Sequence, residues 1–359
     1  MSLSTLHDFD MILATCVDKG ASDIHLTIHQ SVTYRIHGQL VNYGDPPLTE
    51  KEIMAFIEKL ATEDQRRELA THHNSEFGFQ YKDGNRFRVS LYKQRSHPAA
   101  VLRLIDSHIR GMDEVGLPPI IKKLLDKNNG LILVTGPTGS GKSTTLASMV
   151  DYINETDDRH IITIEDPIEY VHPNKRSIIN QRELGIDTLS FSKALVEALR
   201  QDPDVILVGE MRDLATIETA LMATETGHVV LSTVHTFGAA RSLDRIIDVF
   251  PAHQQNQIRT QISLNLAAVI SQELIPRQDR EGRIAAFEIM IMTPAIQNLL
   301  RKGQTFNIQN EIQTGSQHGM ISQQNQLVEF VSKGILSKED AIFYAVDQAD
   351  VARRLGVTL

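Results

Sequence analysis

The fold is decided by the stretch Leu131-Ile132-Leu133-Val134-Thr135-Gly136-Pro137-Thr138-Gly139-Ser140-Gly141-Lys142-Ser143-Thr144. Residues 131–135 are apolar and rich in β-branched side chains, which predicts a buried strand. Residues 136–143 match the pattern G-x-x-x-x-G-K-[ST], and the apolar spacing of residues 144–150 predicts a helix. A glycine-rich loop between a strand and a helix is the context in which this pattern binds phosphate. The sequence therefore predicts a nucleoside triphosphate site.

The residues of this loop have distinct expected roles. Its glycines let backbone N–H groups turn toward the phosphates, and the amino terminus of the following helix adds a partial positive charge. We expect Lys142 to contact the β- and γ-phosphates and the Ser143 hydroxyl to hold Mg²⁺. The nucleotide-binding residues predicted in the loop are Gly136, Pro137, Thr138, Gly139, Ser140, Gly141, Lys142, Ser143 and Thr144.

The composition excludes several classes of protein. The chain has 359 residues, of which 41% are hydrophobic and 23% charged, as in a globular protein with room for two domains. The net charge of −9 argues against bulk electrostatic binding, so no direct nucleic-acid partner is expected. The single Cys16 excludes an internal disulfide framework and a four-cysteine zinc site. No run of about eighteen apolar residues and no signal peptide are present, so a cytoplasmic protein is expected.

Residues 1–106 are expected to form a small α+β domain. Apolar spacing predicts a helix over 6–19 and a long helix from Thr49 to about Ala70, with Glu52 completing a capping box. Asp83-Gly84 is expected to form a hairpin turn. Alternating polar and apolar residues predict mostly antiparallel strands at 23–28, 32–38, 77–81, 86–92 and 101–105.

Residues 107–117 lose this periodicity and lead into two prolines, so we predict an interdomain linker there. From residue 118 to 359, strands and helices alternate, which predicts a parallel sheet covered by helices. The expected strands are 131–135, 160–165, 204–208, 228–233 and 284–292. The expected helices are 119–126, 191–201, 213–226 and 252–271. Residues 293–359 are expected to form a small helical subdomain from 295–301, 319–334 and 338–354.

Two predicted strands end in acidic residues. The strand 160–165 ends in Glu165, followed by Asp166, and a proline stops the strand there. The strand 204–208 is followed by Gly209 and Glu210. Ligands of parallel sheets lie beyond the carboxyl ends of the strands, so all three acids are expected to face the nucleotide. An isolated Glu-Asp-Pro turn is more often a solvated loop, but its place at a strand end favours a functional site. Glu210 is predicted to hold Mg²⁺ through a water.

Two histidines flank a third strand. His228 begins the run 228–233 and His235 follows it, and we expect both beside the nucleotide edge of the sheet. Their separation along the strand is too large for both to bind one metal in zinc-like geometry. A lone histidine beside a strand is more often structural than functional. With two histidines beside one strand, a functional role is about as frequent as a structural one.

Four arginines could supply positive charge to the γ-phosphate. Arg88 and Arg103 lie on strands of the first domain, where an arginine more often packs its stem or caps an edge. Arg200 and Arg212 flank the acidic box around Glu210 and could instead pair with its carboxylates. The charge could come from the same chain or from a neighbouring one.

Taken together, these boxes resemble the type II/IV secretion ATPase superfamily, and most closely the PilT family of type IV pilus retraction ATPases. The resemblance covers nearly the whole chain, through 21–26, 34–38, 136–143, 162–169, 204–213 and 227–236. It implies an α/β protein with a PAS-like α+β domain at the amino terminus and a RecA-like P-loop ATPase domain that ends in a small helical subdomain. ATP and Mg²⁺ are the implied cofactors.

The resemblance also implies roles for residues outside the loop. Glu165 resembles the general base that activates water, and Glu210 resembles the Walker B acid beside Mg²⁺. His228 resembles a sensor of the γ-phosphate. Arg88 and Arg103 resemble arginines that reach the nucleotide when the two domains close. Further nucleotide contacts are expected from Asp166, His235, Arg200 and Arg212.

The implied assembly is a ring-shaped homohexamer. Such a ring docks on an inner-membrane platform protein at the cytoplasmic face of the membrane, as a peripheral protein. ATP turnover withdraws pilin from the pilus and drives twitching motility, so pilin is an indirect partner.

Two related functions stay open. Assembly ATPases of pili and type II secretion usually carry an additional amino-terminal domain and a four-cysteine zinc motif, and the chain has only Cys16. Retraction members usually have Ala-Ile-Arg-Asn where this chain has Ala295-Ile296-Gln297-Asn298, and Asn is common where it has Phe237. An assembly or DNA-uptake motor and a non-hydrolysing accessory paralogue therefore stay as alternatives to a retraction motor.

Overall fold

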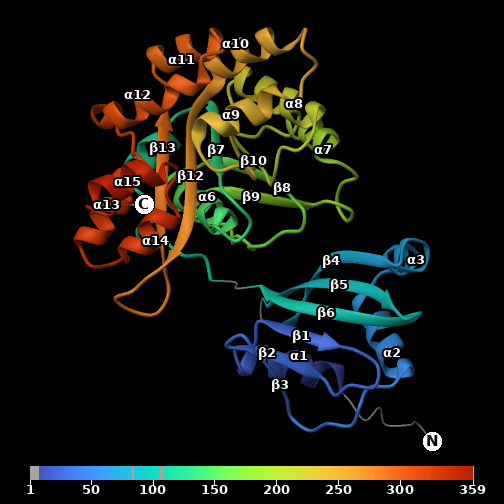
Figure 1. Cartoon of the computed structure of the whole chain (residues 1–359). Coiled ribbons are helices and arrows are strands. Elements are labelled where there is room, and N and C mark those ends of the chain that lie inside the picture. The colour runs from blue at the N-terminus through green and yellow to red at the C-terminus, as the bar shows by residue number, and fades with distance from the viewer. Residues whose placement is uncertain (1–7, 83–84, 106–107, 359) are drawn as a thin grey trace, which may run out of the picture. The chain divides into compact units, whose positions relative to one another are not determined.

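The computed structural model describes residues 8–82, 85–105 and 108–358, which form two compact units (Figure 1). The first unit contains Met1–His108 and Pro167–Val171, and the second contains Ile109–Asp166 and His172–Leu359. The predicted turn at Asp83-Gly84 lies outside the described residues, as does the start of the predicted linker.

The first unit is built on a six-stranded antiparallel sheet with the order β3-β2-β1-β6-β5-β4. Its strands are β1 (Asp23–Leu26), β2 (Thr33–Ile36), β3 (Gln39–Asn42), β4 (Asn74–Gln80), β5 (Arg86–Gln94) and β6 (His97–Ile105). Its helices are α1 (Phe9–Asp18), α2 (Glu50–Leu60) and α3 (Glu63–His72). The predicted α+β domain with a mainly antiparallel sheet is confirmed, and β3 is an additional strand.

The long helix predicted from Thr49 is in fact two helices. Thr49 and Glu52 form the predicted capping box at the start of α2. Ala61 then adopts an extended conformation and ends α2, and Thr62 forms a second capping box with Gln65 that starts α3. The prediction failed because the apolar spacing continues from one helix into the next, so periodicity alone does not show that a second helix starts at Thr62.

The second unit is built on a seven-stranded sheet with the order β13-β12-β7-β11-β10-β8-β9. Every neighbouring pair is parallel except β12 and β13. The strands are β7 (Gly130–Thr135), β8 (His160–Glu165), β9 (Ile178–Glu183), β10 (Val205–Val208), β11 (Val229–Val234), β12 (Leu266–Pro276) and β13 (Arg283–Ile291). The main helices around them are α6 (Lys142–Thr156), α7 (Phe191–Ala198), α8 (Leu214–Glu225), α9 (Ala239–Ile247) and α10 (Gln255–Asn265). The short helices α4 (Met112–Val115) and α5 (Ile120–Leu125) precede β7.

Helices cover both faces of this sheet, and its central strands β10 and β11 are therefore buried throughout. All four residues of β10 and all six of β11 are buried. Met149 and Val150 of α6 join one core cluster with Ile132. Ile217 of α8 joins the other with Leu133. Successive residues of one strand, such as Ile132 and Leu133, thus enter opposite cores.

The predicted helix 252–271 was wrong in its second half. The structure ends α10 at Asn265 and continues at once into β12, which pairs with β7 on one side and β13 on the other. A strand buried on both faces has a continuous apolar run, which cannot be distinguished from a buried helix by periodicity. The edge strand β9 was also missed, because Asn180 and Gln181 interrupt any apolar alternation.

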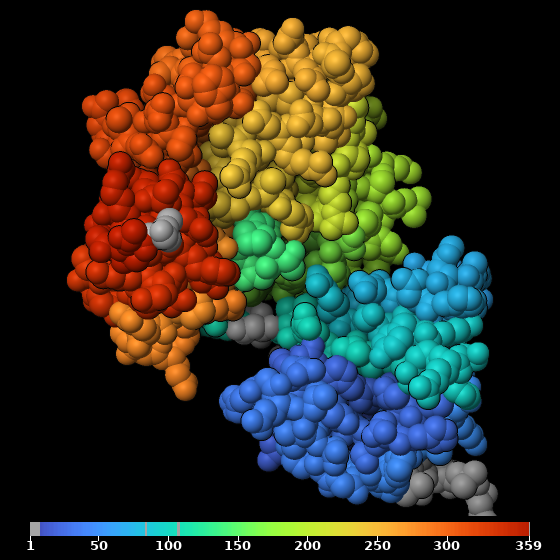
Figure 2. All heavy atoms as spheres, in the orientation of Figure 1, coloured from blue at the N-terminus to red at the C-terminus, as the bar shows by residue number. Residues whose placement is uncertain are grey.

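The chain ends in short helices packed beside the β12–β13 hairpin, coloured orange to red in Figure 2. They are α11 (Pro294–Arg301), α12 (Ile308–Thr314), α13 (Gln323–Ser332), α14 (Lys338–Phe343) and α15 (Gln348–Arg354). Leu327, Leu336 and Ala341 form a small core of their own with Ile275. No helix within the described ranges has the length and apolar character needed to cross a membrane.

Candidate active site

The candidate site lies along the carboxyl edge of the second sheet. Strands β7, β8, β10 and β11 are parallel, so their carboxyl ends share this edge. The phosphate-loop sequence follows β7, Glu165 ends β8, Glu210 follows β10, and His235 follows β11. Four of the boxes found in the sequence are therefore brought to one edge by strand direction alone.

The loop 136–141 has the backbone shape of a phosphate cradle. Gly139 and Gly141 have φ values of 80° and 87°, in the left-handed region, and Gly141 is the N-cap of α6. Lys142 is buried, and its Nζ donates to the carbonyl oxygens of Gly136 and Pro137, 2.9 Å from each. An ammonium held against the inside of the loop is placed to exchange those carbonyls for phosphate oxygens.

Gln272 of β12 braces this loop and was missed by the sequence analysis. The residue is 1% exposed, its Nε2 donates to the carbonyl of Ser140, and its Oε1 accepts from Thr145 Oγ1 at 2.6 Å. A side chain on Gly136 would collide with the carbonyl oxygen of Gln272. The loop therefore rests on β12, and its first glycine is required by that contact.

Glu165 is oriented by two neighbours. Its Oε1 accepts from Thr163 Oγ1 at 2.6 Å and from Gln181 Nε2 at 3.1 Å. Gln181 lies across from Thr163 in the β8–β9 pair and also accepts from the backbone N–H of His172 through its Oε1, at 2.8 Å. A carboxylate held by two donors has a fixed direction, as a general base needs. The neighbouring Asp166 is exposed.

Glu210 and His235 contact each other across adjacent strand ends. Glu210 Oε2 lies 2.9 Å from His235 Nε2, and Arg212 forms an ion pair with the other oxygen. Partial burial, Lys142 and Arg212 all lower the pKa of His235. The imidazole is therefore neutral at neutral pH, and its Nε2–H can donate to Glu210.

Gly209, which precedes Glu210, lies where the ends of β8 and β10 come close together. A Cβ on Gly209 would lie 3.3 Å from the carbonyl oxygen of Ile164 and 3.4 Å from the Cα of Glu165. The Gly209 N–H donates to the same carbonyl at 2.8 Å. The absent side chain lets the ends of β8 and β10 approach, which brings the two acidic boxes together.

Two predicted site residues lie elsewhere. His228 precedes β11 at the amino edge, where its Nδ1 lies 2.8 Å from the carbonyl of Ala223. The six residues of β11 separate it from His235, and the seven steps between the two histidines correspond to about 23 Å of strand. Arg200 is exposed just before the amino end of β10. Both residues were expected to face the nucleotide. The structure corrects this, because they lie at the amino edge of the sheet and the phosphate loop of the same chain lies at the carboxyl edge.

Arg88 and Arg103 belong to the first unit, where they are direct cross-strand neighbours on β5 and β6. Arg103 Nε donates to Asp23 Oδ1 at 2.8 Å, and Arg88 donates to Glu169 at 2.9 Å. Asp23 is buried, and its bonds with Arg103 and Ser22 hold the pKa of its carboxyl below the usual value against the effect of burial. Both arginines are thus paired within their own unit.

A divalent cation would find oxygen donors at the carboxyl edge. Ser143 lies in the first turn of α6 and Glu210 follows β10, and hydroxyl and carboxylate oxygens are the ligands that Mg²⁺ prefers. Within residues 8–82, 85–105 and 108–358, no group of three or more His, Cys, Asp or Glu side chains could hold a metal by itself. This donor set fits an ion that takes its remaining ligands from phosphates and water.

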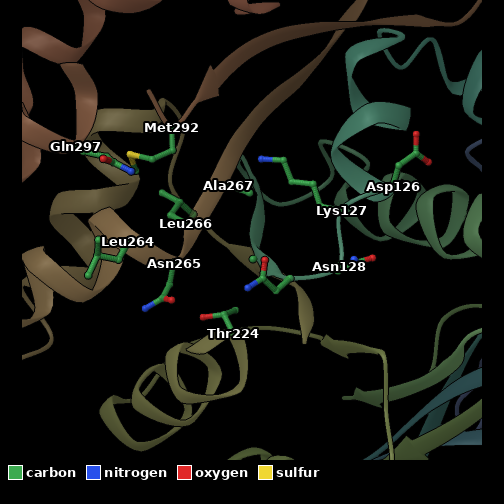
Figure 3. A pocket seen from close by; sticks show the side chains of 12 residues that line it. Asp126, Lys127, Asn128, Thr224, Leu264, Asn265, Leu266, Ala267, Met292 and Gln297 are labelled. Carbon is green, nitrogen blue, oxygen red and sulfur yellow. The ribbon is translucent and has the colours of Figure 1, made fainter. Parts of the chain in front are cut away.

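A separate pocket of about 520 Å³ lies at the amino edge of the same sheet. Figure 3 shows Met292 and Gln297 together on one side of it and Lys127 and Asn128 on the other, with Thr224 on a third. The phosphate-loop residues do not line it. Gln297, the departure from the family pattern, therefore belongs to the edge opposite the phosphate loop.

Comparison with known proteins gives a consistent assignment. Residues 4–343 match the family described as Type II/IV secretion system protein. The chain is 46% identical over 334 residues to the type IV pilus retraction ATPase PilT of Pseudomonas aeruginosa, covering 93% of this chain and 97% of that protein. It is 38% identical over 344 residues to the type IV pilus ATPase PilU of the same organism, covering 96% and 90%.

A solved structure agrees with these sequence matches. The crystal structure of the pilus retraction motor PilT with bound ADP superposes with a TM-score of 0.89 and 43% sequence identity. The superposition covers 97% of this chain and 99% of that one. The similarity therefore extends over both units.

Proposed function

The chain belongs to the type II/IV secretion system protein family, and on that premise we propose that it is an ATP-hydrolysing motor that powers retraction of a type IV pilus. The observation that carries the proposal is the gathering of Lys142, Glu165 and the Glu210–His235 pair at one sheet edge. These are the parts that phosphoryl transfer to water needs: a cation for the phosphates, a base for the water, and an oriented acid.

The proposed reaction assigns each step to a residue of this chain. The phosphate loop and Lys142 bind the triphosphate of ATP. Glu165 accepts a proton from a water molecule while the oxygen of that water attacks the γ-phosphorus. The bond from that phosphorus to the bridging oxygen breaks, and ADP and phosphate result. His235 senses the γ-phosphate beside Glu210, a role we transfer from His228 because of its position.

Ser143 and Glu210 are the residues that would hold Mg²⁺, Glu210 through a water molecule. When bound, the ion neutralises negative charge on the β- and γ-phosphates. Glu210 is fixed for this role by His235 and Arg212, and Ser143 by the first turn of α6. The related retraction motor was solved with bound ADP, which supports nucleotide binding by this chain.

The proposed assembly is the one that the resemblance to pilus retraction ATPases implies. We propose a homohexameric ring, peripheral to the cytoplasmic face of the inner membrane through a platform protein, that withdraws pilin without contacting nucleic acid. The proposed domains are 1–106, a linker at 107–117, and 118–359 with its helical end at 293–359. Arg88, Arg103, Arg200 and Asp166 are proposed to reach nucleotide only in the closed or assembled state.

An accessory motor is a second candidate, favoured by two observations. Gln297 stands where retraction ATPases usually have Arg, and the chain is also 38% identical to the pilus ATPase PilU. Gln297 lies at the amino-edge pocket, so the substitution leaves the carboxyl edge intact. ATP hydrolysis is expected under either function, so this candidate differs from the non-hydrolysing accessory paralogue that the sequence left open.

Imaging a deletion strain tests the proposal. Loss of a retraction motor should leave cells with an excess of pili that do not retract and with no twitching. Cells without pili would overturn retraction and support assembly. Normal retraction by a second motor in the deletion strain would support the accessory function instead.

A further inference from the structure

Glu288 is a buried carboxylate to which neither the sequence boxes nor the proposed reaction gives a role. It is 1% exposed and lies on β13, directly across from Ser271 of β12. A carboxylate is costly to bury unless its oxygens are hydrogen-bonded. The partners of its two oxygens therefore indicate what it does.

One oxygen of Glu288 caps the amino terminus of α9. Its Oε1 accepts from the backbone N–H of Ala239, the first residue of that helix, at 2.8 Å. The N-cap residue, Gly238, has no side chain that could do this. The first N–H groups of a helix lack partners within the helix, and negative charge there is favourable. Glu288, on β13, supplies both the hydrogen-bond acceptor and the negative charge.

Ser271 holds the preceding N–H group of the same loop. Its Oγ accepts from Gly238 N at 3.1 Å and lies 2.5 Å from Thr135 Oγ1, in the last residue of β7 before the phosphate loop. Two consecutive N–H groups after His235 are thus bound by two side chains that face each other across the hairpin.

These bonds fix His235 from its carboxyl-terminal side. On its other side, the carbonyl of Val234 at the end of β11 accepts from Gly136 N at 3.3 Å. Only residues 236 and 237 separate His235 from the two anchored N–H groups. The loop 235–238 therefore has little freedom while both anchors hold.

The second oxygen of Glu288 reaches the helical end of the chain. Gln309 of α12 donates from Nε2 to Glu288 Oε2 at 2.9 Å. Thr305, just before α12, donates to Asp244 of α9 at 3.1 Å. The carboxylate thus joins the start of α9 to the carboxyl-terminal helices.

We propose that Glu288 is a positioning residue for ATP hydrolysis, which holds the loop carrying His235 in register with Glu210 and ties that loop to the carboxyl-terminal helices. The inference rests on the proposed reaction at the carboxyl edge and adds the residue that orients it. Glu288 does not touch the nucleotide, so its loss should slow turnover while leaving nucleotide binding to the phosphate loop.

The test compares steady-state ATP hydrolysis and ADP affinity of the full chain and its variants. Glu288→Ala should lower kcat about tenfold, as the loss of an orienting partner does, with KM and ADP affinity within about twofold of wild type. Glu288→Gln should recover most of the activity, because its amide oxygen can still accept from Ala239. Glu281→Ala is the matched control, since it removes an exposed carboxylate from the tip of the same hairpin.

Each outcome decides the proposal. Wild-type kcat in folded Glu288→Ala would overturn it, as would a fall in ADP affinity equal to the fall in kcat. If Glu288→Ala does not fold, Glu288→Asp keeps the charge but shortens the reach, and wild-type kcat in that variant would also overturn it. If the wild-type chain does not hydrolyse ATP, the proposed function fails first. Amide exchange of 235–239, expected to be faster in Glu288→Asp than in wild type, then still tests the anchoring.

Discussion

The two edges of the second sheet carry the same kinds of side chain but use them differently. At the carboxyl edge, His235 contacts Glu210 of the next strand, and its pKa is lowered by partial burial and by nearby cations. At the amino edge, His228 contacts the carbonyl of Ala223, the residue five positions before it. Strand direction thus separates two histidines of one sequence box into a site residue and a structural one.

The largest expected change in ATP turnover comes from removing the ammonium group of Lys142 at the carboxyl edge. Lys142→Ala removes the charge that the loop holds against its own carbonyls, so turnover should fall roughly a thousandfold or more. A coupled phosphate-release assay with the purified chain measures this. Lys127→Ala, at the amino-edge pocket, is the matched control and should keep its activity.

The next effect separates binding from chemistry. Glu165→Gln keeps a side chain of the same shape but cannot accept a proton from water, so kcat should fall about a hundredfold or more. ATP affinity, measured by calorimetry, should stay close to wild type because the phosphate loop is intact. Unchanged turnover in this variant would remove Glu165 from the role of base.

Paired histidine variants test the two edges directly. His235→Ala removes the partner of Glu210 and should lower kcat about tenfold. His228→Ala removes a bond to a carbonyl of its own helix end and should cost clearly less activity. A larger loss of kcat in folded His228→Ala than in His235→Ala would contradict the assignment of the two residues.

The last expected effect is on stability rather than on turnover, and it is an acid sensitivity close to Glu165. Burial lowers the pKa of His172 from 6.5 to about 4, and the backbone of the same residue donates to Gln181, which holds Glu165. Between these pH values the unfolded chain binds a proton that the folded chain does not, so stability should fall as pH decreases. The full loss is about 3 kcal/mol.

Denaturant titrations at several pH values measure this loss. His172→Gln has no titrating side chain, so its free energy of unfolding should depend less on pH than that of wild type between pH 6.5 and 4. If the free energy of unfolding depends on pH equally in both proteins, the side chain of His172 is not held in its neutral form by burial.

The sequence predicted the carboxyl edge well because its residues follow strands. Glycine spacing and apolar runs located the phosphate loop, Glu165 and Glu210, and strand direction does the rest. The position of His228 was also open to prediction, since a residue before a parallel strand lies at the amino edge. The family resemblance nevertheless led to the prediction that His228 faces the nucleotide.

The residues that brace the site could not be predicted in the same way. Gln272 and Glu288 belong to β12 and β13, and β12 has an apolar run that periodicity cannot distinguish from a helix. Gln181 lies on a polar edge strand that no alternation marks. Such side chains act through pairing between distant strands, which a single sequence does not reveal.

Hydrogen–deuterium exchange of the full chain with and without ADP and Mg²⁺ tests the central claim most directly. The claim is that nucleotide binds at the carboxyl edge of the second sheet. Amides of 136–145 should then become protected when ADP binds, whereas amides of 126–130, at the amino edge, should change little. Protection confined to 126–130 with none in the phosphate loop would contradict the account.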